Sequence, residues 1–176
     1  MKTKEITQIG LSVALLTICS WITIPLTIPF TLQTFGIFFI LLMLKGKNGT
    51  IAILSYILLG AVGVPVFSGF KSGVGALMGM TGGYIVGFLL TGLLYWLITT
   101  ILGNKTYVKI GALLLGLIAC YLFGTIWFIR VYSAQVGSMG VMTALSMCVF
   151  PFLIPDSIKL GLAFCISKRV VRAIEN

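Results

Sequence analysis

Long apolar stretches, separated by short polar segments, run along almost the whole chain. Each stretch is continuously apolar, whereas strands of a membrane barrel alternate in polarity over about ten residues, so the pattern favours helices. A helix that crosses a bilayer needs about 20 apolar residues. The pattern predicts six such helices, at residues 7–25, 33–44, 49–63, 82–103, 107–130 and 155–172. We therefore expect an all-α integral membrane protein with six transmembrane helices, in which residues 1–176 form a single membrane domain.

The composition agrees with a membrane protein and leaves no room for a separate soluble domain. Hydrophobic residues make up 59% of the chain and charged residues 9%, whereas a soluble domain carries roughly 25% charged residues. The segment Met1–Lys4 precedes an apolar run, as in a signal peptide, but the run continues without a small-residue cleavage pattern and so predicts a first transmembrane helix. The cysteines are isolated and histidine is absent, so no metal site is expected.

Basic residues give the chain a net charge of +9, which could suggest a nucleic-acid partner. Their distribution argues against that partner, because they punctuate the apolar stretches and thereby mark topology. With the N-terminus inside, nine of them fall in inner segments: Lys2, Lys4, Lys45, Lys47, Lys105, Lys109, Lys168, Arg169 and Arg172. Only Lys71 and Arg130 fall outside. We therefore predict that both termini are cytoplasmic, that the lipid bilayer surrounds the chain, and that no nucleic acid binds it.

Two prolines interrupt the last apolar region. Pro151 and Pro155 are four residues apart, and each lacks an amide hydrogen and clashes with the preceding helical turn. A continuous helix through both is therefore not expected. Because proline is favoured at the first position of a helix, the last helix is predicted to start at Pro155, with Asp156 in its first turn. Residues 139–149 are expected to form a short helix that lies at the outer face or enters the membrane part-way.

Asp156 is one of three acidic residues and lies deep in an apolar stretch. Lys159 follows at i+3, on the same helix face. A charge inside a membrane segment is costly and indicates a functional site by default; the alternative is a mutually neutralised structural pair. A ligand site is favoured, because the apolar loop 25–33, the glycine-rich loop 64–81 and Tyr84 are all expected at the same outer end. Such a pocket would suit a small ligand.

Small residues recur at i+4 spacing on three predicted helices, a pattern that lets helices approach closely. The fifth predicted helix carries Ala112, Gly116, Cys120 and Gly124, and the fourth carries Gly83 and Gly87. These two stripes are expected to pack inside the protein. Gly10 and Ala14 repeat the spacing on the first helix. There, internal packing and contact with another protein both remain open.

The motifs of several enzyme classes are missing. The sequence has no GxxxxGK[ST] loop, so the chain itself is not expected to hydrolyse ATP by that motif. Gly73, Gly75 and Gly79 have the wrong spacing for a dinucleotide-binding loop. Without histidine there is no Ser-His-Asp triad, and Asp156 has no second carboxylate to work with. We therefore expect no enzyme and no catalytic residue. A solitary ion-coupled carrier, in which Asp156 titrates, remains an alternative.

Four segments of the chain resemble those of the BioY family. They are Pro-Phe-Thr-Leu-Gln-Thr-Phe at 29–35, Gly-Val-Pro-Val-Phe-Ser-Gly at 63–69, Gly-Met-Thr-Gly-Gly-Tyr-Ile-Val-Gly-Phe at 79–88 and Pro-Phe-Leu-Ile-Pro-Asp-Ser-Ile-Lys at 151–159. The segments occur in order over nearly the whole chain, which makes the resemblance specific. The sequence departs from the family pattern at Met80, where a proline is usual, and at Pro155, where a glycine is frequent.

The resemblance implies a biotin-specific substrate-binding (S) component of an energy-coupling factor (ECF) transporter, in a bacterial or archaeal cell membrane. It implies six helices, high-affinity biotin binding from outside, no cofactor, and partners that comprise a transmembrane coupling subunit and two cytoplasmic ATPases that use the ATP. The residues that it implies for substrate binding are Gln33, Tyr84, Asp156 and Lys159. Gly10 and Ala14 take the place of the small residues that contact the coupling subunit. An S component for another vitamin remains an alternative.

The chemistry of the two charged residues suits biotin. The ureido ring of biotin has two N–H donors and one carbonyl acceptor. A buried carboxylate such as that of Asp156 can accept hydrogen bonds from the N–H groups, and the ammonium of Lys159 can donate to the carbonyl. The aromatic, Met and Leu side chains expected around the pair suit the thioether ring and the valeryl chain.

Overall fold

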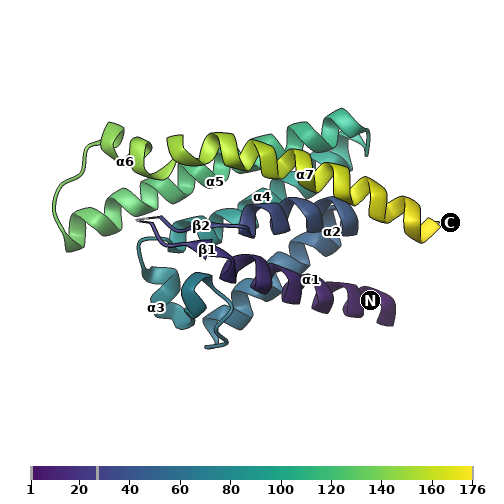
Figure 1. The fold of residues 1–176 in the computed structure, drawn as a ribbon, viewed down its shortest axis with the longest axis horizontal. Helices are drawn as coiled ribbons and strands as arrows, with labels where there is room; N and C mark the ends of the chain where they lie inside the picture. Colours follow the sequence, from purple (N-terminus) through teal and green to yellow (C-terminus); the bar gives the residue numbers. More distant parts are fainter. Residues whose placement is uncertain (1, 27, 176) are drawn as a thin grey trace.

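The computed structural model describes residues 2–26 and 28–175, most of which are helical. The long helices are α1 (Thr3–Trp21), α2 (Gln33–Ala61), α4 (Gly82–Leu102), α5 (Thr106–Gln135) and α7 (Phe150–Glu175). The short elements are β1 (Thr23–Ile24), β2 (Phe30–Thr31), the 3-10 turn η1 (Ser68–Phe70), α3 (Gly73–Met78) and α6 (Val141–Cys148). The long helices form a bundle, with both termini at one end and the short elements at the other (Figure 1). After the predicted orientation, these are called the inner and the outer end.

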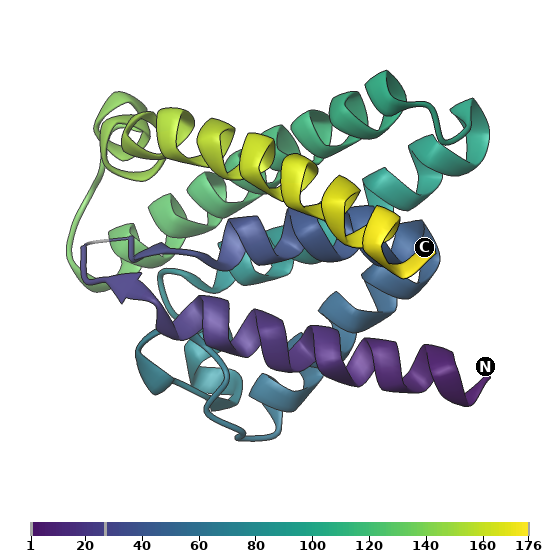
Figure 2. The ribbon, with the colours of Figure 1, turned by 45° about the vertical axis from the view of Figure 1, so that its right-hand side comes forward.

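Helix α2 is interrupted at Lys45, where φ is 62° and ψ is 179°. The chain turns there, and the second half of α2 runs back toward the outer end (Figure 2). The turn is tight, since a Cβ at Gly49 would lie 2.9 Å from Leu41 Cδ2, so a larger residue would push the two halves apart. The break falls between the predicted helices 33–44 and 49–63, and confirms that these are two separate segments.

Four helical stretches of the described chain are long and apolar enough to cross a membrane, namely α2, α4, α5 and Val141–Ala173. The turn at Lys45 divides α2 into two segments, and α1 is a further long helix. Six long segments therefore form the bundle, in agreement with the six predicted. Helix α1 ends at Trp21 rather than at residue 25, and α5 continues to Gln135 rather than ending at residue 130. Both termini lie at the same end (Figure 1); that this end faces the cytoplasm stays a prediction.

The predicted start of the last helix at Pro155 is wrong. Helix α7 begins at Phe150 and contains Pro155. Pro151 falls in the first turn, where amides have no partner within the helix in any case, so it costs nothing there. Only Pro155 removes an internal hydrogen bond, and the helix continues through that one loss. Asp156 therefore lies in the second turn rather than in the first. The short helix expected at 139–149 is α6.

Helices α4 and α5 make the most extensive contact in the bundle, and small residues lie between them. A Cβ added at Gly87 would lie 2.7 Å from Cys120 Sγ, and one added at Gly116 would lie 3.0 Å from Thr91 Cα. Thr91 Oγ1 also donates a hydrogen bond to the carbonyl of Gly116 over 2.9 Å. The prediction that these two stripes pack inside the protein is confirmed.

Candidate functional site

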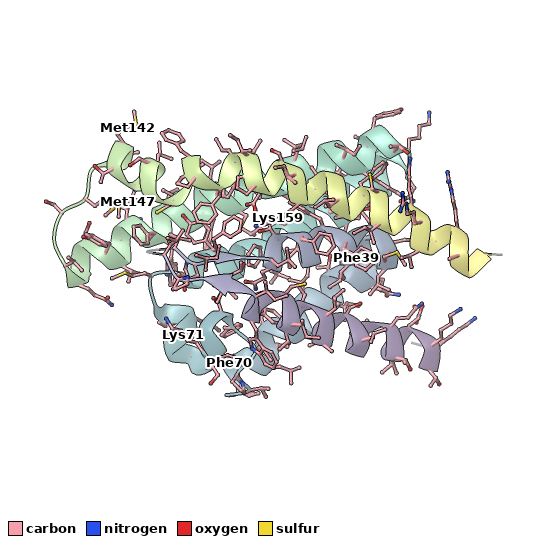
Figure 3. All side chains as sticks on the ribbon, viewed as in Figure 1. Phe39, Phe70, Lys71, Met142, Met147 and Lys159 are labelled. Atoms are coloured by element: carbon pink, nitrogen blue, oxygen red, sulfur yellow. The ribbon has the colours of Figure 1, made fainter. Side chains whose placement is uncertain are left out.

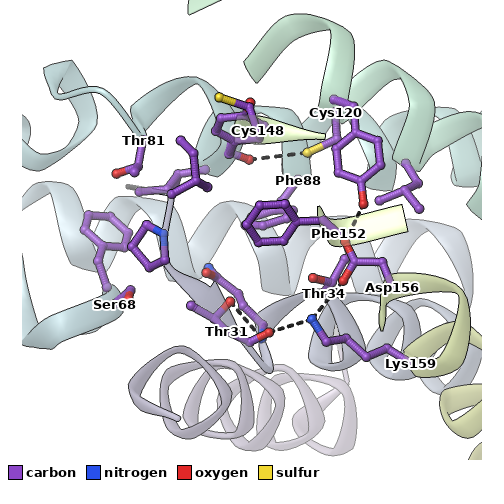
Figure 4. A pocket seen from close by; sticks show the side chains of 18 of the residues that line it. Thr31, Thr34, Ser68, Thr81, Phe88, Cys120, Cys148, Phe152, Asp156 and Lys159 are labelled. Atoms are coloured by element: carbon purple, nitrogen blue, oxygen red, sulfur yellow. Dashed lines mark hydrogen bonds and ion pairs between the residues drawn. The ribbon is translucent and has the colours of Figure 1, made fainter. Parts of the chain in front are cut away.

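The two charged residues of α7 are the centre of a small hydrogen-bonded group. Lys159 Nζ lies 2.8 Å from Asp156 Oδ1 and donates a second hydrogen bond, of 2.7 Å, to the backbone carbonyl of Thr31 in β2. Tyr121 Oη in α5 donates to Asp156 Oδ2 over 2.6 Å. Figure 4 shows this group at one side of a cavity. The pair therefore connects α7 with both α5 and the β1–β2 hairpin.

Both charged side chains are buried, with exposed fractions of 4% for Asp156 and 7% for Lys159. Lys159 lies within the bundle and away from both of its ends (Figure 3). Its ammonium lies 4.1 Å from the centre of the Phe30 ring, whose negative face attracts a cation. Removing one partner of a buried ion pair leaves the other charge uncompensated, at a cost of about 3–5 kcal/mol. The two residues therefore depend on each other for burial.

A cavity extends from this pair toward the outer end of the bundle. The loop between α1 and α2 contributes Ile28 and Pro29 to its wall, and the segment between α2 and α4 contributes Phe67, Ser68 and Thr81. Lys71 and residues of β2, α2, α3, α4, α5, α6 and α7 complete the wall. The prediction that an apolar loop, a glycine-rich loop and the start of the fourth helix converge near the buried pair is therefore confirmed.

The other two predicted substrate residues, Gln33 and Tyr84, line the same cavity. Gln33 Nε2 donates to Tyr56 Oη over 3.0 Å, and Tyr56 Oη donates in turn to the carbonyl of Val66 over 2.9 Å. Tyr84 Oη lies 3.0 Å from Thr125 Oγ1 in α5. The structure thus brings all four predicted substrate residues to one cavity, on three different helices.

Gly10 and Ala14 lie away from this cavity, on an exposed face of α1. No atom of the described chain lies within 4 Å of a Cβ built at Gly10, apart from its own helical surroundings. Of the two alternatives that the sequence left open for this stripe, internal packing is therefore wrong. The face is open to the surroundings of the protein.

Several residues that hold the buried pair were not predicted. Tyr121 directly follows Cys120 of the small-residue stripe, so its side chain is rotated by about 100° from the face that contacts α4. This position could have indicated that Tyr121 faces another helix. Thr31 and Phe30 belong to a hairpin in which Thr23 pairs with Thr31. Its strands are two residues long, too short to show an alternating pattern.

The chemistry available at this site is hydrogen bonding in an apolar enclosure. Asp156 accepts two hydrogen bonds from the protein, and a carboxylate has about four lone-pair sites, so it can accept more from a ligand. Lys159 uses two of its three donors on protein oxygens. Among the described residues, no three potential metal ligands gather anywhere. The arrangement suits a small ligand with a polar ring and an apolar remainder.

Comparison with known proteins relates the chain to a family along its whole length. The family model described as "BioY family" matches residues 1–176. A probable biotin transporter BioY of Pyrococcus horikoshii is 36% identical, over 97% of this chain and 98% of that protein. The biotin transporter BioY of Thermotoga maritima is 35% identical, over 87% of this chain and 78% of that protein.

The fold has a counterpart among solved structures. The crystal structure of the S-component for biotin from an ECF-type ABC transporter matches with a TM-score of 0.82 and 26% sequence identity. The match covers 98% of this chain and 95% of that one. Sequence and fold therefore point to the same group of proteins.

Proposed function

The chain belongs to the BioY family, and from this premise we propose that it captures biotin from outside the cell as the S component of an ECF transporter. It is a multi-pass membrane protein of a transporter family and not an enzyme. The named biotin transporters among its relatives and its likeness to a biotin S-component support the substrate. The observation that carries the proposal is the buried pair of Asp156 and Lys159 at the wall of the outer cavity.

The pair complements the ureido ring of biotin. The free acceptor sites of Asp156 suit the two ureido N–H groups, and the remaining donor of Lys159 suits the ureido carbonyl. Because the two protein charges already neutralise each other, a neutral ring can bind without adding a net charge to a buried site. Gln33 and Tyr84 supply further polar groups in the cavity wall, and Phe88 and Phe152 supply apolar surface for the thioether ring and the valeryl chain.

Titration calorimetry on the purified chain tests the substrate. We expect tight binding of biotin in the absence of ATP and of any partner, because the cavity is formed by this chain alone. Heat with another vitamin but none with biotin would reassign the substrate. Uptake of biotin by vesicles that contain only this chain would favour a solitary ion-coupled carrier instead.

Substitution of the buried pair tests the site. Asp156→Ala and Lys159→Ala should each weaken biotin binding, by about 2–5 kcal/mol, since each leaves a buried polar partner unpaired. Ser157→Ala is the matched control, because Ser157 lies next to Asp156, is exposed, and bonds only to the carbonyl of Leu153 in its own helix. Wild-type affinity in both charge variants would make the pair purely structural.

We further propose that the chain delivers biotin together with a transmembrane coupling subunit and two cytoplasmic ATPases. The chain has no GxxxxGK[ST] loop, so energy from ATP has to come from another protein. Gly10 and Ala14 form an open strip on α1, where another helix could approach closely. We assign this strip to the coupling subunit.

A further inference from the structure

A cavity distinct from the proposed biotin site lies near the inner end of the bundle. It forms where the first turn of α5 meets the last turns of α7, beside the middle of α2. Its lining residues are Leu42, Thr106, Lys109, Phe164, Ser167, Lys168, Val171 and Arg172, and none of them lines the outer cavity. Its volume is about 250 Å³, far more than the roughly 10–15 Å³ that a cavity needs on the same measure to hold one water.

Three basic residues line this inner cavity. Lys109 comes from α5, and Lys168 and Arg172 come from successive turns of α7. Among the described residues, none that lines the cavity is acidic. Asp156 belongs to the outer cavity, and Glu5 accepts a hydrogen bond from the backbone amide of Lys2. Topology alone requires basic residues at this end, but it does not require three of them around one hollow.

The start of α5 adds to the positive potential of the inner cavity. Thr106 is the first residue of this 30-residue helix and lines the cavity. Lys105 at the N-cap provides no side-chain cap for the first-turn amides. Free amides and the helix dipole both attract anions. The dipole supplements the three cations, which by themselves call for an anionic ligand.

Three apolar residues line the cavity beside the cations, together with Thr106 and Ser167. The apolar residues are Leu42, Phe164 and Val171. Of these, Val171 is 36% exposed, so apolar surface of the cavity is open to the surroundings of the protein. A free phosphate ion would leave this apolar surface uncovered. A lipid would cover it with its acyl chains and place its phosphate among the cations.

We propose that the inner cavity binds the phosphate group of an anionic phospholipid, with Lys109, Lys168 and Arg172 around the phosphate. Basic pockets between transmembrane helices on the cytoplasmic side suit such headgroups, and the inner end is the one predicted to face the cytoplasm. The bound lipid would fasten the start of α5 to the end of α7. The proposal does not depend on biotin, because the two cavities share no residue.

Native mass spectrometry of the detergent-purified chain, titrated with phosphatidylglycerol or phosphatidylcholine, tests the proposal. Wild-type protein should retain one phosphatidylglycerol in preference to phosphatidylcholine. The variant Lys109→Gln/Lys168→Gln/Arg172→Gln should lose this preference by roughly tenfold or more, because each cation near an anionic headgroup contributes to binding. The control Lys2→Gln/Lys4→Gln/Lys47→Gln removes the same charge from exposed positions outside the cavity, and should keep the preference.

Each other outcome overturns the proposal. Equal retention of the two lipids by the wild type, or equal loss in the two triple variants, would reduce the effect to general surface charge. Displacement of phosphatidylglycerol by millimolar inorganic phosphate would identify free phosphate as the ligand. Unchanged lipid retention in the cavity variant, together with lost co-purification of the ATPase subunits, would identify an acidic partner surface instead. The thermal midpoint of each variant shows whether it is folded.

Discussion

Two stripes of small residues look alike in the sequence and lie in opposite surroundings. On α5, Gly116 has the backbone of Thr91 against it, with 3.0 Å from a built Cβ to Thr91 Cα. On α1, a Cβ built at Gly10 has no neighbour within 4 Å, and Ala14 is exposed one turn later. The first stripe is occupied by α4, and the second faces outward.

This difference shows what the spacing of small residues does and does not specify. The i+4 repeat predicts a place where a helix can be approached closely. It does not specify whether the approaching helix belongs to the same chain. A membrane offers little hydrophobic driving force between helices, so an open strip of small residues is not closed by collapse of the bundle. Substitutions that fill each stripe can therefore separate folding from assembly.

The largest effect is expected at the occupied stripe. Gly116→Leu would force α4 and α5 apart and disturb the hydrogen bond from Thr91 to the carbonyl of residue 116. We expect a loss of about 3 kcal/mol or more, as for severe overpacking, visible as aggregation on size-exclusion chromatography or as a lower thermal midpoint. Gly111→Leu on the same helix is the control, because nothing lies within 4 Å of its built Cβ. Similar behaviour of the two variants would contradict the assigned contact.

The next effect is expected at the open stripe, and on assembly alone. Gly10→Leu together with Ala14→Leu should fill the strip on α1, abolish co-purification with the ATPase module and stop biotin uptake by cells. Biotin binding by the isolated chain should remain within about twofold, since neither residue lines the outer cavity. Binding measured by calorimetry and assembly measured by affinity pull-down separate the two functions.

A matched control for this pair is Gly161→Leu, at an exposed glycine of α7 with no atom within 4 Å of its built Cβ. It adds the same bulk to another open face and should leave assembly intact. If the α1 variant loses biotin binding but still assembles, the strip supports the fold and the coupling subunit contacts another surface.

Most of the fold could be predicted from the sequence, because apolar runs and basic residues carry strong signals. The break near Lys45 was visible as a short apolar run that ends in Lys-Gly-Lys. Pro155 was misleading, because proline inside a helix is unfavourable but not forbidden. Pro151 lies in the first turn, where its missing amide costs no hydrogen bond, so α7 loses only the one bond at Pro155 and continues. The β1–β2 hairpin was invisible, because its strands are only two residues long.

The candidate site was predictable in part. Asp156 and Lys159 stand out because charges are rare in apolar stretches. Their partners Tyr121 and Thr31 are ordinary residues whose roles follow from tertiary contacts 35 and 128 residues away along the chain. Such contacts leave no periodic signal in one sequence. The structure supplies them, and with them the reason why the pair can be buried.

The smallest expected effect is also the sharpest comparison, because a single methyl group should act in opposite directions on the two stripes. Gly10→Ala adds a methyl group in open space, and the lower flexibility of alanine should stabilise α1 by up to about 1 kcal/mol. Gly87→Ala places the same group 2.7 Å from Cys120 Sγ and 3.1 Å from Cys120 Cα, and overpacking should destabilise the chain by about 1–3 kcal/mol. Thermal midpoints in one detergent should rise for the first variant and fall for the second. Assembly should persist in Gly10→Ala, since alanine is still small enough for close helix contact. Two upward shifts would mean that helix propensity outweighs the contact at Gly87, and two downward shifts would mean that Gly10 is packed against a neighbour; either result would contradict the contrast between the stripes.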